Sequence, residues 1–106
     1  MKKALNIACV NNAAFVMNFS IQWLNDDTGL WETCGWNSGN YPIDQYRKSP
    51  DLASIGVPDD AVVRPVVHAM AGLSHEGSPF VRCAGGADTV TYIVAGTTLN
   101  FSVKVP

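Results

Sequence analysis

Apolar and polar residues alternate along two stretches of the chain with a period of two. The stretches FVMNFSIQW (15–23) and LNFSVKV (99–105) place apolar side chains at all of their odd-numbered positions. Successive side chains of a β-strand point to opposite faces, so each stretch is predicted to be a strand with one buried and one solvent face. Leu99 is expected on the buried face, and Trp23 is expected to close one end of the core.

Shorter signals divide the rest of the chain. NDDTG (25–29) is typical of a hairpin turn, with LWETCGW (30–36) as the returning strand. Further strands are predicted in residues 3–10, 78–83 and 89–95, and in the stretch 57–72, whose valine run spans residues 62–67. No segment has a helical period, although SPDLASIG predicts one turn that ends at Gly56. Six to eight short strands indicate an all-β fold, with residues 1–106 forming one antiparallel β-sandwich; a small β-barrel is the alternative.

The valine-rich segment VVRPVVHA (62–69) contains Pro65, which has no backbone N–H to donate to a neighbouring strand. We therefore expect this strand at the edge of a sheet or at a bulge. An edge strand exposes unpaired backbone groups, and a second copy of the chain can pair with them. The sequence thus leaves open a homo-oligomer that forms through sheet edges.

Charge and hydropathy exclude several partners. Seven basic and nine acidic residues give a net charge of −2 without a basic patch, so nucleic acid is not expected as a partner. No stretch reaches the ~18 apolar residues of a transmembrane helix. The opening MKKALNIACV is interrupted by Asn6, so it is expected to be a strand rather than a signal peptide. We expect cytoplasmic synthesis, and release by an unconventional route stays open.

Residues suited to catalysis or metal binding are few. The cysteines at positions 9, 34 and 83 form no CxxC pair and are expected to be reduced and buried. His75 and Glu76 lie in a glycine-bounded loop, but their spacing fits no zinc site, and GLSHEG is no nucleophile elbow. His68, in the valine-rich strand, is expected to be structural. We therefore expect no enzyme, no cofactor and no metal.

The segment CGWNSGNYPIDQYR (34–47) is predicted to be a binding loop, because it combines aromatic rings with amide, carboxylate and guanidinium groups. Trp31 and Trp36 are five residues apart and fall on opposite faces of a regular strand. Since Trp36 shares its face with Glu32, Trp31 is expected to point inward and Trp36 outward. The residues predicted to bind a ligand are Trp36, Asn37, Asn40, Tyr41, Asp44, Tyr46 and Arg47.

These features predict a small, non-catalytic binding module. Aromatic faces beside amide and carboxylate groups are suited to sugars, so a lectin-like, carbohydrate-binding role with a glycan or cell-surface ligand is the first interpretation. The second is a membrane- or cell-surface-binding toxin or defence protein that uses the same aromatic residues at the lipid boundary. The third is a structural homo-oligomeric subunit. In overall character the chain is similar to small lectins without a signal sequence and to pore-forming sandwich proteins.

Overall fold

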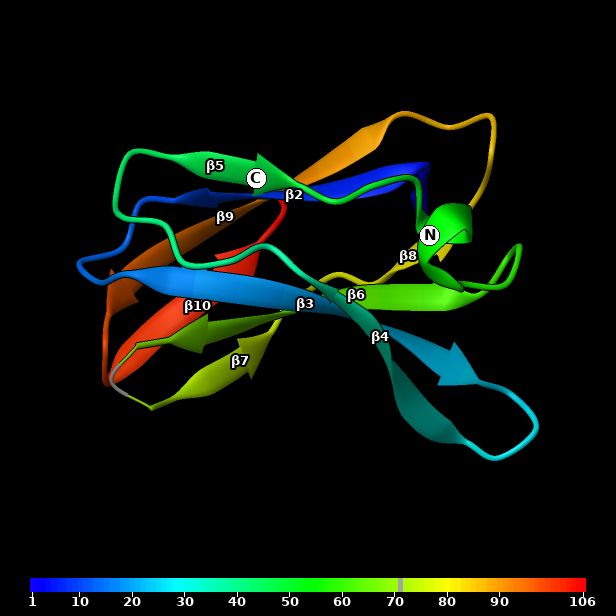
Figure 1. Ribbon diagram of the computed structural model, residues 1–106, viewed down its shortest axis with the longest axis horizontal. Coiled ribbons are helices and arrows are strands. Elements are labelled where there is room, and N and C mark those ends of the chain that lie inside the picture. Colours follow the sequence, from blue (N-terminus) through cyan, green and yellow to red (C-terminus); the bar gives the residue numbers. More distant parts are fainter. Residues whose placement is uncertain (71) are drawn as a thin grey trace.

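The computed structural model describes residues 1–70 and 72–106, which form two β-sheets packed face to face (Figure 1). This arrangement confirms the predicted all-β sandwich. The first sheet has six strands: β1 (Lys3–Ala4), β3 (Met17–Asn25), β4 (Leu30–Asn37), β6 (Val62–Ala69), β7 (Ser74–Glu76) and β8 (Val81–Cys83). The second has four: β2 (Asn6–Asn11), β5 (Tyr46–Lys48), β9 (Thr89–Thr97) and β10 (Asn100–Lys104).

Both sheets are mixed, whereas the alternation predicted antiparallel pairing throughout. The first sheet runs β1-β8-β6-β3-β4, with β7 also paired to β6, and the second runs β10-β9-β2-β5. The pairs β1–β8 and β2–β9 are parallel. Each pair joins segments that are far apart in the chain. The alternating pattern could not predict these pairs, because a period of two indicates which face of a strand is buried but not which strands lie beside it. Several strands of two or three residues raise the count above the predicted six to eight.

The predicted inward faces form the core between the sheets. Met17, Phe19 and Ile21 of β3 and Phe101 and Val103 of β10 are buried. Trp23 packs at the margin of this core, as expected. The prediction for Leu99 is wrong, because this residue lies in the two-residue turn between β9 and β10 and is 83% exposed.

Pro65 lies in an interior strand whose pairing with β3 continues without a register shift, so its predicted position at a sheet edge or a bulge is wrong. The strand β6 pairs with β3 on one side and with β8 and β7 on the other. Pro65 falls in the interval between the β8 and β7 pairings, where its carbonyl accepts a hydrogen bond from the Gly77 N–H at 2.8 Å. Because no strand pairs with this side of β6 in the interval, no neighbouring strand requires a backbone N–H from residue 65. With both of its sides occupied, β6 cannot pair with a second copy as the sequence suggested.

The smaller predictions are confirmed. A turn joins β3 to β4, and Gly29 there has a φ of 72°. The 3₁₀ helix η1 (Leu52–Ile55) ends at Gly56, which adopts the left-handed conformation. Cys9, Cys34 and Cys83 are buried free thiols, and burial raises the pKa of each.

Candidate functional site

The segment between β4 and β5, residues 38–45, crosses from the first sheet to the second (Figure 1). Tyr41 anchors this crossover. It exchanges two backbone hydrogen bonds with Met17, at 3.1 and 2.8 Å, and its hydroxyl donates to the carbonyl of Cys9 at 2.8 Å. Tyr41 is only 1% exposed, so the prediction that it stacks on a ligand is wrong. The ring fills the gap that the crossover would otherwise leave over the core.

Arg47 covers the Tyr41 ring from outside. Its guanidinium carbon lies 4.9 Å from the ring centroid, and Nη1 donates to Oε1 of Gln45 and to the carbonyl of Tyr46, both at 3.1 Å. Burial and the neighbouring Cys9 raise the pKa of the Tyr41 hydroxyl, while Arg47 opposes this rise. These hydrogen bonds hold the Arg47 side chain over the buried Tyr41 ring.

The two tryptophans of β4 are reversed relative to the prediction. Trp36 is half-buried against the core, with its ring centroid 5.2 Å from that of Phe19, whereas Trp31 lies on the outer face of the sheet. Trp36 shares its face with Glu32, as the spacing predicted. Glu32, however, lies near the hairpin end of β4, where the strand is exposed, so its charge says nothing about the face that Trp36 takes.

We expect Trp36→Ala to lower the free energy of unfolding by about 2–3 kcal/mol, somewhat less than the loss of a fully buried aromatic side chain. Urea denaturation followed by fluorescence measures this change. Trp31→Ala is the matched variant on the opposite face and is expected to cost about 1 kcal/mol or less. Equal losses for the two variants would contradict the assignment of Trp36 to the core.

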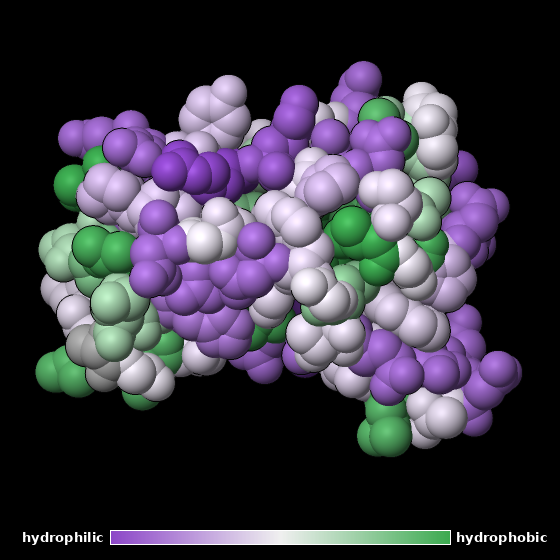
Figure 2. Space-filling model, in the orientation of Figure 1, coloured by the Kyte–Doolittle hydropathy of each residue, from purple (hydrophilic) through white to green (hydrophobic). Residues whose placement is uncertain are grey.

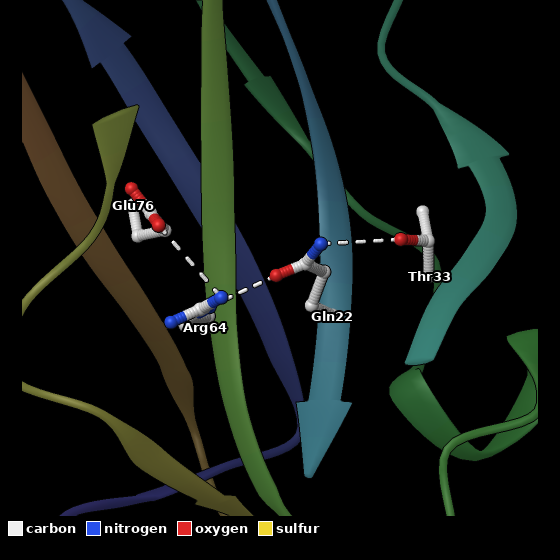
Figure 3. A network of polar contacts seen from close by, with 4 residues as sticks. All are labelled: Gln22, Thr33, Arg64 and Glu76. Atoms are coloured by element: carbon white, nitrogen blue, oxygen red, sulfur yellow. Dashed lines mark hydrogen bonds and ion pairs between the residues drawn. The ribbon is translucent and has the colours of Figure 1, made fainter. Parts of the chain in front are cut away.

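Trp31 belongs to a polar network on the outer face. The Arg64 guanidinium lies 3.8 Å from the Trp31 ring centroid. Figure 3 shows two polar partners of Arg64: its Nε donates to Gln22 at 2.9 Å, and its Nη2 lies 3.8 Å from Glu76. Gln22 in turn donates to Thr33. Arg64 is thereby engaged within the protein.

Four of the predicted ligand-binding residues are exposed: Asn37, Asn40, Asp44 and Tyr46. Three amide side chains form what we call the amide row: Asn18, Asn37 and Asn40. Asn18 accepts a hydrogen bond from Asn37 at 2.9 Å and donates to Asn40 at 3.1 Å. The structure therefore brings Asn37 and Asn40 together around a residue of β3 that the sequence had assigned only to a solvent face.

One end of the sandwich exposes large apolar side chains in four connections between strands. We call this surface the apolar tip; its members are Val16, Ile43, Met70, Leu73 and Leu99. The loops meet through backbone bonds: Met70 N–H donates to Val16, Ala14 N–H to Gly96, and Asp44 N–H to Asn11. They lie at the left of Figure 1, and Figure 2 shows hydrophobic side chains at that end and hydrophilic ones beside them over β3.

The tip carries almost no charge. Residues 12–16, 42–44, 70–73 and 98–99 include a single charged side chain, that of Asp44. The opposite end differs, because Asp26, Asp27, Asp59 and Asp60 line one groove there together with Arg82. The molecule is therefore polarised along its length, with one apolar end and one acidic end.

Sequence reasoning missed the tip because it assigned apolar residues to strands. A signal was nevertheless present: MAGL (70–73) and TTL (97–99) place Met or Leu where a connection between strands normally carries polar residues. Ile43 has the same unusual position within the predicted binding loop. The alternating pattern assigned Leu99 to a strand, so the most exposed residue of the apolar tip was not recognised.

Within residues 1–70 and 72–106, no three His, Cys, Asp or Glu side chains are grouped to hold a metal ion. No helix in these ranges is long and apolar enough to cross a bilayer.

Comparison with known proteins gives structural relatives alone, since the sequence matches no protein-family model and no curated protein sequence. Intermedilysin, solved as a disulfide-locked mutant with human CD59, aligns with 95% of this chain at 18% identity and a TM-score of 0.52. A Gram-negative toxin aligns with 92% at 16% identity and a TM-score of 0.51. The membrane-binding domain of pneumolysin aligns with 92% at 16% identity and a TM-score of 0.49, over 91% of its own length.

The chain spans only part of the first two proteins, covering 24% of intermedilysin and 22% of the Gram-negative toxin. At these identities the likeness is one of fold. The chain therefore shares its sandwich with a segment of less than a quarter of each of these two proteins.

Proposed function

We propose that this chain is a small, non-catalytic module that binds membranes or cell surfaces, of the toxin or defence type, and that it contacts the bilayer with its apolar tip. The observation that carries the proposal is the gathering of five exposed apolar side chains at one end, with a single charged residue among their loops. Exposed apolar patches rimmed by polar residues mark contacts with proteins or membranes.

The energetics favour a bilayer as that partner. Full burial of one large aliphatic side chain is worth roughly 1.5–3 kcal/mol, so partial burial of five supplies several kcal/mol. Tyr46, 63% exposed and three residues after Ile43, is suited to the lipid–water boundary, where tyrosine is enriched. The aspartates at the far end favour the same orientation, because anionic lipid repels them.

The structural relatives support this proposal at the level of fold. The Gram-negative toxin contains the same sandwich as one part of a larger chain, and intermedilysin was solved together with human CD59. The first protein thus combines this fold with toxicity, and the second combines it with a named protein partner.

The test is co-sedimentation with phosphatidylcholine vesicles. We expect binding that changes less than about twofold between physiological and ~1 M salt, because screening acts on charges and the tip has nearly none. Protein that stays in the supernatant at all lipid concentrations would overturn the proposal. Binding that requires anionic lipid and disappears in high salt would place the contact elsewhere.

Glycan binding by residues 34–47 is the second candidate. It is favoured by the exposed Asn37, Asn40, Asp44 and Tyr46, which present amide, carboxylate and phenol groups on one crossover. Burial of Tyr41 and the inward position of Trp36 remove two of the three aromatic rings that this interpretation used. A glycan-array screen tests the candidate directly.

A further inference from the structure

The amide row lies immediately behind the apolar tip. Asn18 is two residues from Val16, and its cross-strand neighbour His68 is two residues from Met70. At about 3.3 Å per residue, the row stands roughly 7 Å behind the tip along the strands. Amphipathic helices that lie at the interface bury their apolar face by about 5–10 Å. A tip inserted to that depth brings the row to the level of the lipid headgroups.

The row is held in place by its own contacts and by the backbone around it. Ser38 N–H donates to the carbonyl of Phe19 at 3.0 Å, and the Ser38 hydroxyl accepts from the N–H of Phe19 at 2.9 Å. Gly39 N–H donates to Oδ1 of Asn37 at 2.8 Å. With Tyr41 anchored in the core, both ends of the short segment that carries Asn37 and Asn40 are fixed. The amides are thus oriented before a ligand arrives.

His68 extends the polar surface along the same edge of the tip. One ring nitrogen lies 2.7 Å from the Ser74 hydroxyl and the other 3.2 Å from the Ser20 hydroxyl. Within residues 1–70 and 72–106, the Asn40 amide nitrogen has no protein partner and remains able to donate. The surface behind the tip therefore offers fixed donors and acceptors, and its amide and hydroxyl groups are uncharged.

Uncharged amide side chains are better suited to a neutral lipid headgroup than to a phosphate. Phosphate is recognised by Arg and Lys, and the row contains neither, while Arg64 on the same sheet is engaged with Gln22, Glu76 and Trp31. Amide side chains both donate and accept, which matches the hydroxyl groups of a sugar. A neutral sugar attached to a lipid meets both requirements at once, because its headgroup lies at the row and its chains lie in the bilayer that receives the tip.

We propose that Asn18, Asn37 and Asn40 bind the sugar headgroup of a neutral glycolipid while the apolar tip enters the surrounding bilayer. This inference rests on the proposed membrane-binding function and names the lipid class that the site selects. It also gives the predicted polar residues of the crossover a role that does not depend on the buried Tyr41.

The experiment compares phosphatidylcholine vesicles with the same vesicles containing galactosylceramide, glucosylceramide or lactosylceramide. We expect at least one glycolipid to tighten binding by about tenfold, as two well-formed hydrogen bonds would. The double variant Asn18→Ala/Asn40→Ala is expected to bind every vesicle as the wild type binds phosphatidylcholine alone. Thr33→Val, on the same face but in the network of Gln22, is expected to keep the preference. Thermal unfolding of each variant controls for folding.

The outcomes separate the two proposals. Equal wild-type binding with and without glycolipid, or a preference that the double variant retains, overturns the glycolipid inference and leaves membrane binding intact. Absence of binding to every vesicle overturns both. Equally tight binding to bead-linked lactose would show that the protein binds the sugar without a bilayer. That result overturns the proposal that the ligand is a glycolipid.

Discussion

The double variant Met70→Ser/Leu99→Ser is expected to bind phosphatidylcholine vesicles about 100-fold more weakly than the wild type. Each side chain loses the transfer of a large apolar group into the bilayer, worth about 1.5 kcal/mol or more, and every 1.4 kcal/mol corresponds to a factor of ten. Met70 and Leu99 are 62% and 83% exposed, so the free energy of unfolding should change by less than about 0.5 kcal/mol. Vesicle titration by co-sedimentation measures the first quantity, and urea denaturation measures the second.

Leu30→Ser is the matched control for this experiment. Leu30 is 63% exposed and apolar like Leu99, but it lies in the β3–β4 hairpin at the acidic end of the molecule. Its substitution should leave vesicle binding unchanged. Should Leu30→Ser weaken binding as much as the tip variant does, the contact would depend on general surface hydrophobicity, and the tip would lose its assigned role.

The sandwich was predictable because alternation is a direct consequence of strand geometry. Met17, Phe19 and Ile21 are buried because every second side chain of β3 faces the other sheet. The partners of each strand were not predictable from the same signal. The parallel β2–β9 pair and the interior position of Pro65 depend on contacts between distant segments, and the local sequence carries no record of them.

The candidate site was predictable only in part, for a related reason. The polar residues of the crossover were placed correctly on the surface, because an unpaired amide or carboxylate is costly to bury. The aromatic residues were not placed correctly, because a tyrosine or tryptophan is suited to both the core and the surface. Which of the two it occupies depends on whether the folded chain leaves a gap over the core beside it. Tyr41 lies over such a gap, and Met70 and Leu99 come together only after the strands have paired.

Tyr41→Ala is expected to lower the free energy of unfolding by about 3–5 kcal/mol, the largest loss we expect from one substitution in the crossover. The variant opens a cavity beside Met17 and leaves the buried carbonyl of Cys9 without its donor. Tyr41→Phe separates the two effects, because it keeps the ring and removes the hydroxyl, at a cost of about 1–3 kcal/mol. A loss below 1 kcal/mol for the alanine variant would contradict the anchoring role.

The same tyrosine gives the wild type a dependence on alkaline pH. Burial raises the pKa of Tyr41 in the folded state, so the neutral hydroxyl is favoured there, whereas the unfolded chain ionises near pH ~10. The stabilisation is therefore fully present below pH ~10 and is lost as the pH rises above it. Tyr92 is buried and its pKa is raised in the same direction, so Tyr41→Phe should reduce the alkaline loss of stability without abolishing it. Urea midpoints at neutral pH and at pH ~11 for wild type and variant measure this difference. An identical alkaline loss in the two proteins would show that Tyr41 ionises as freely in the fold as in the unfolded chain.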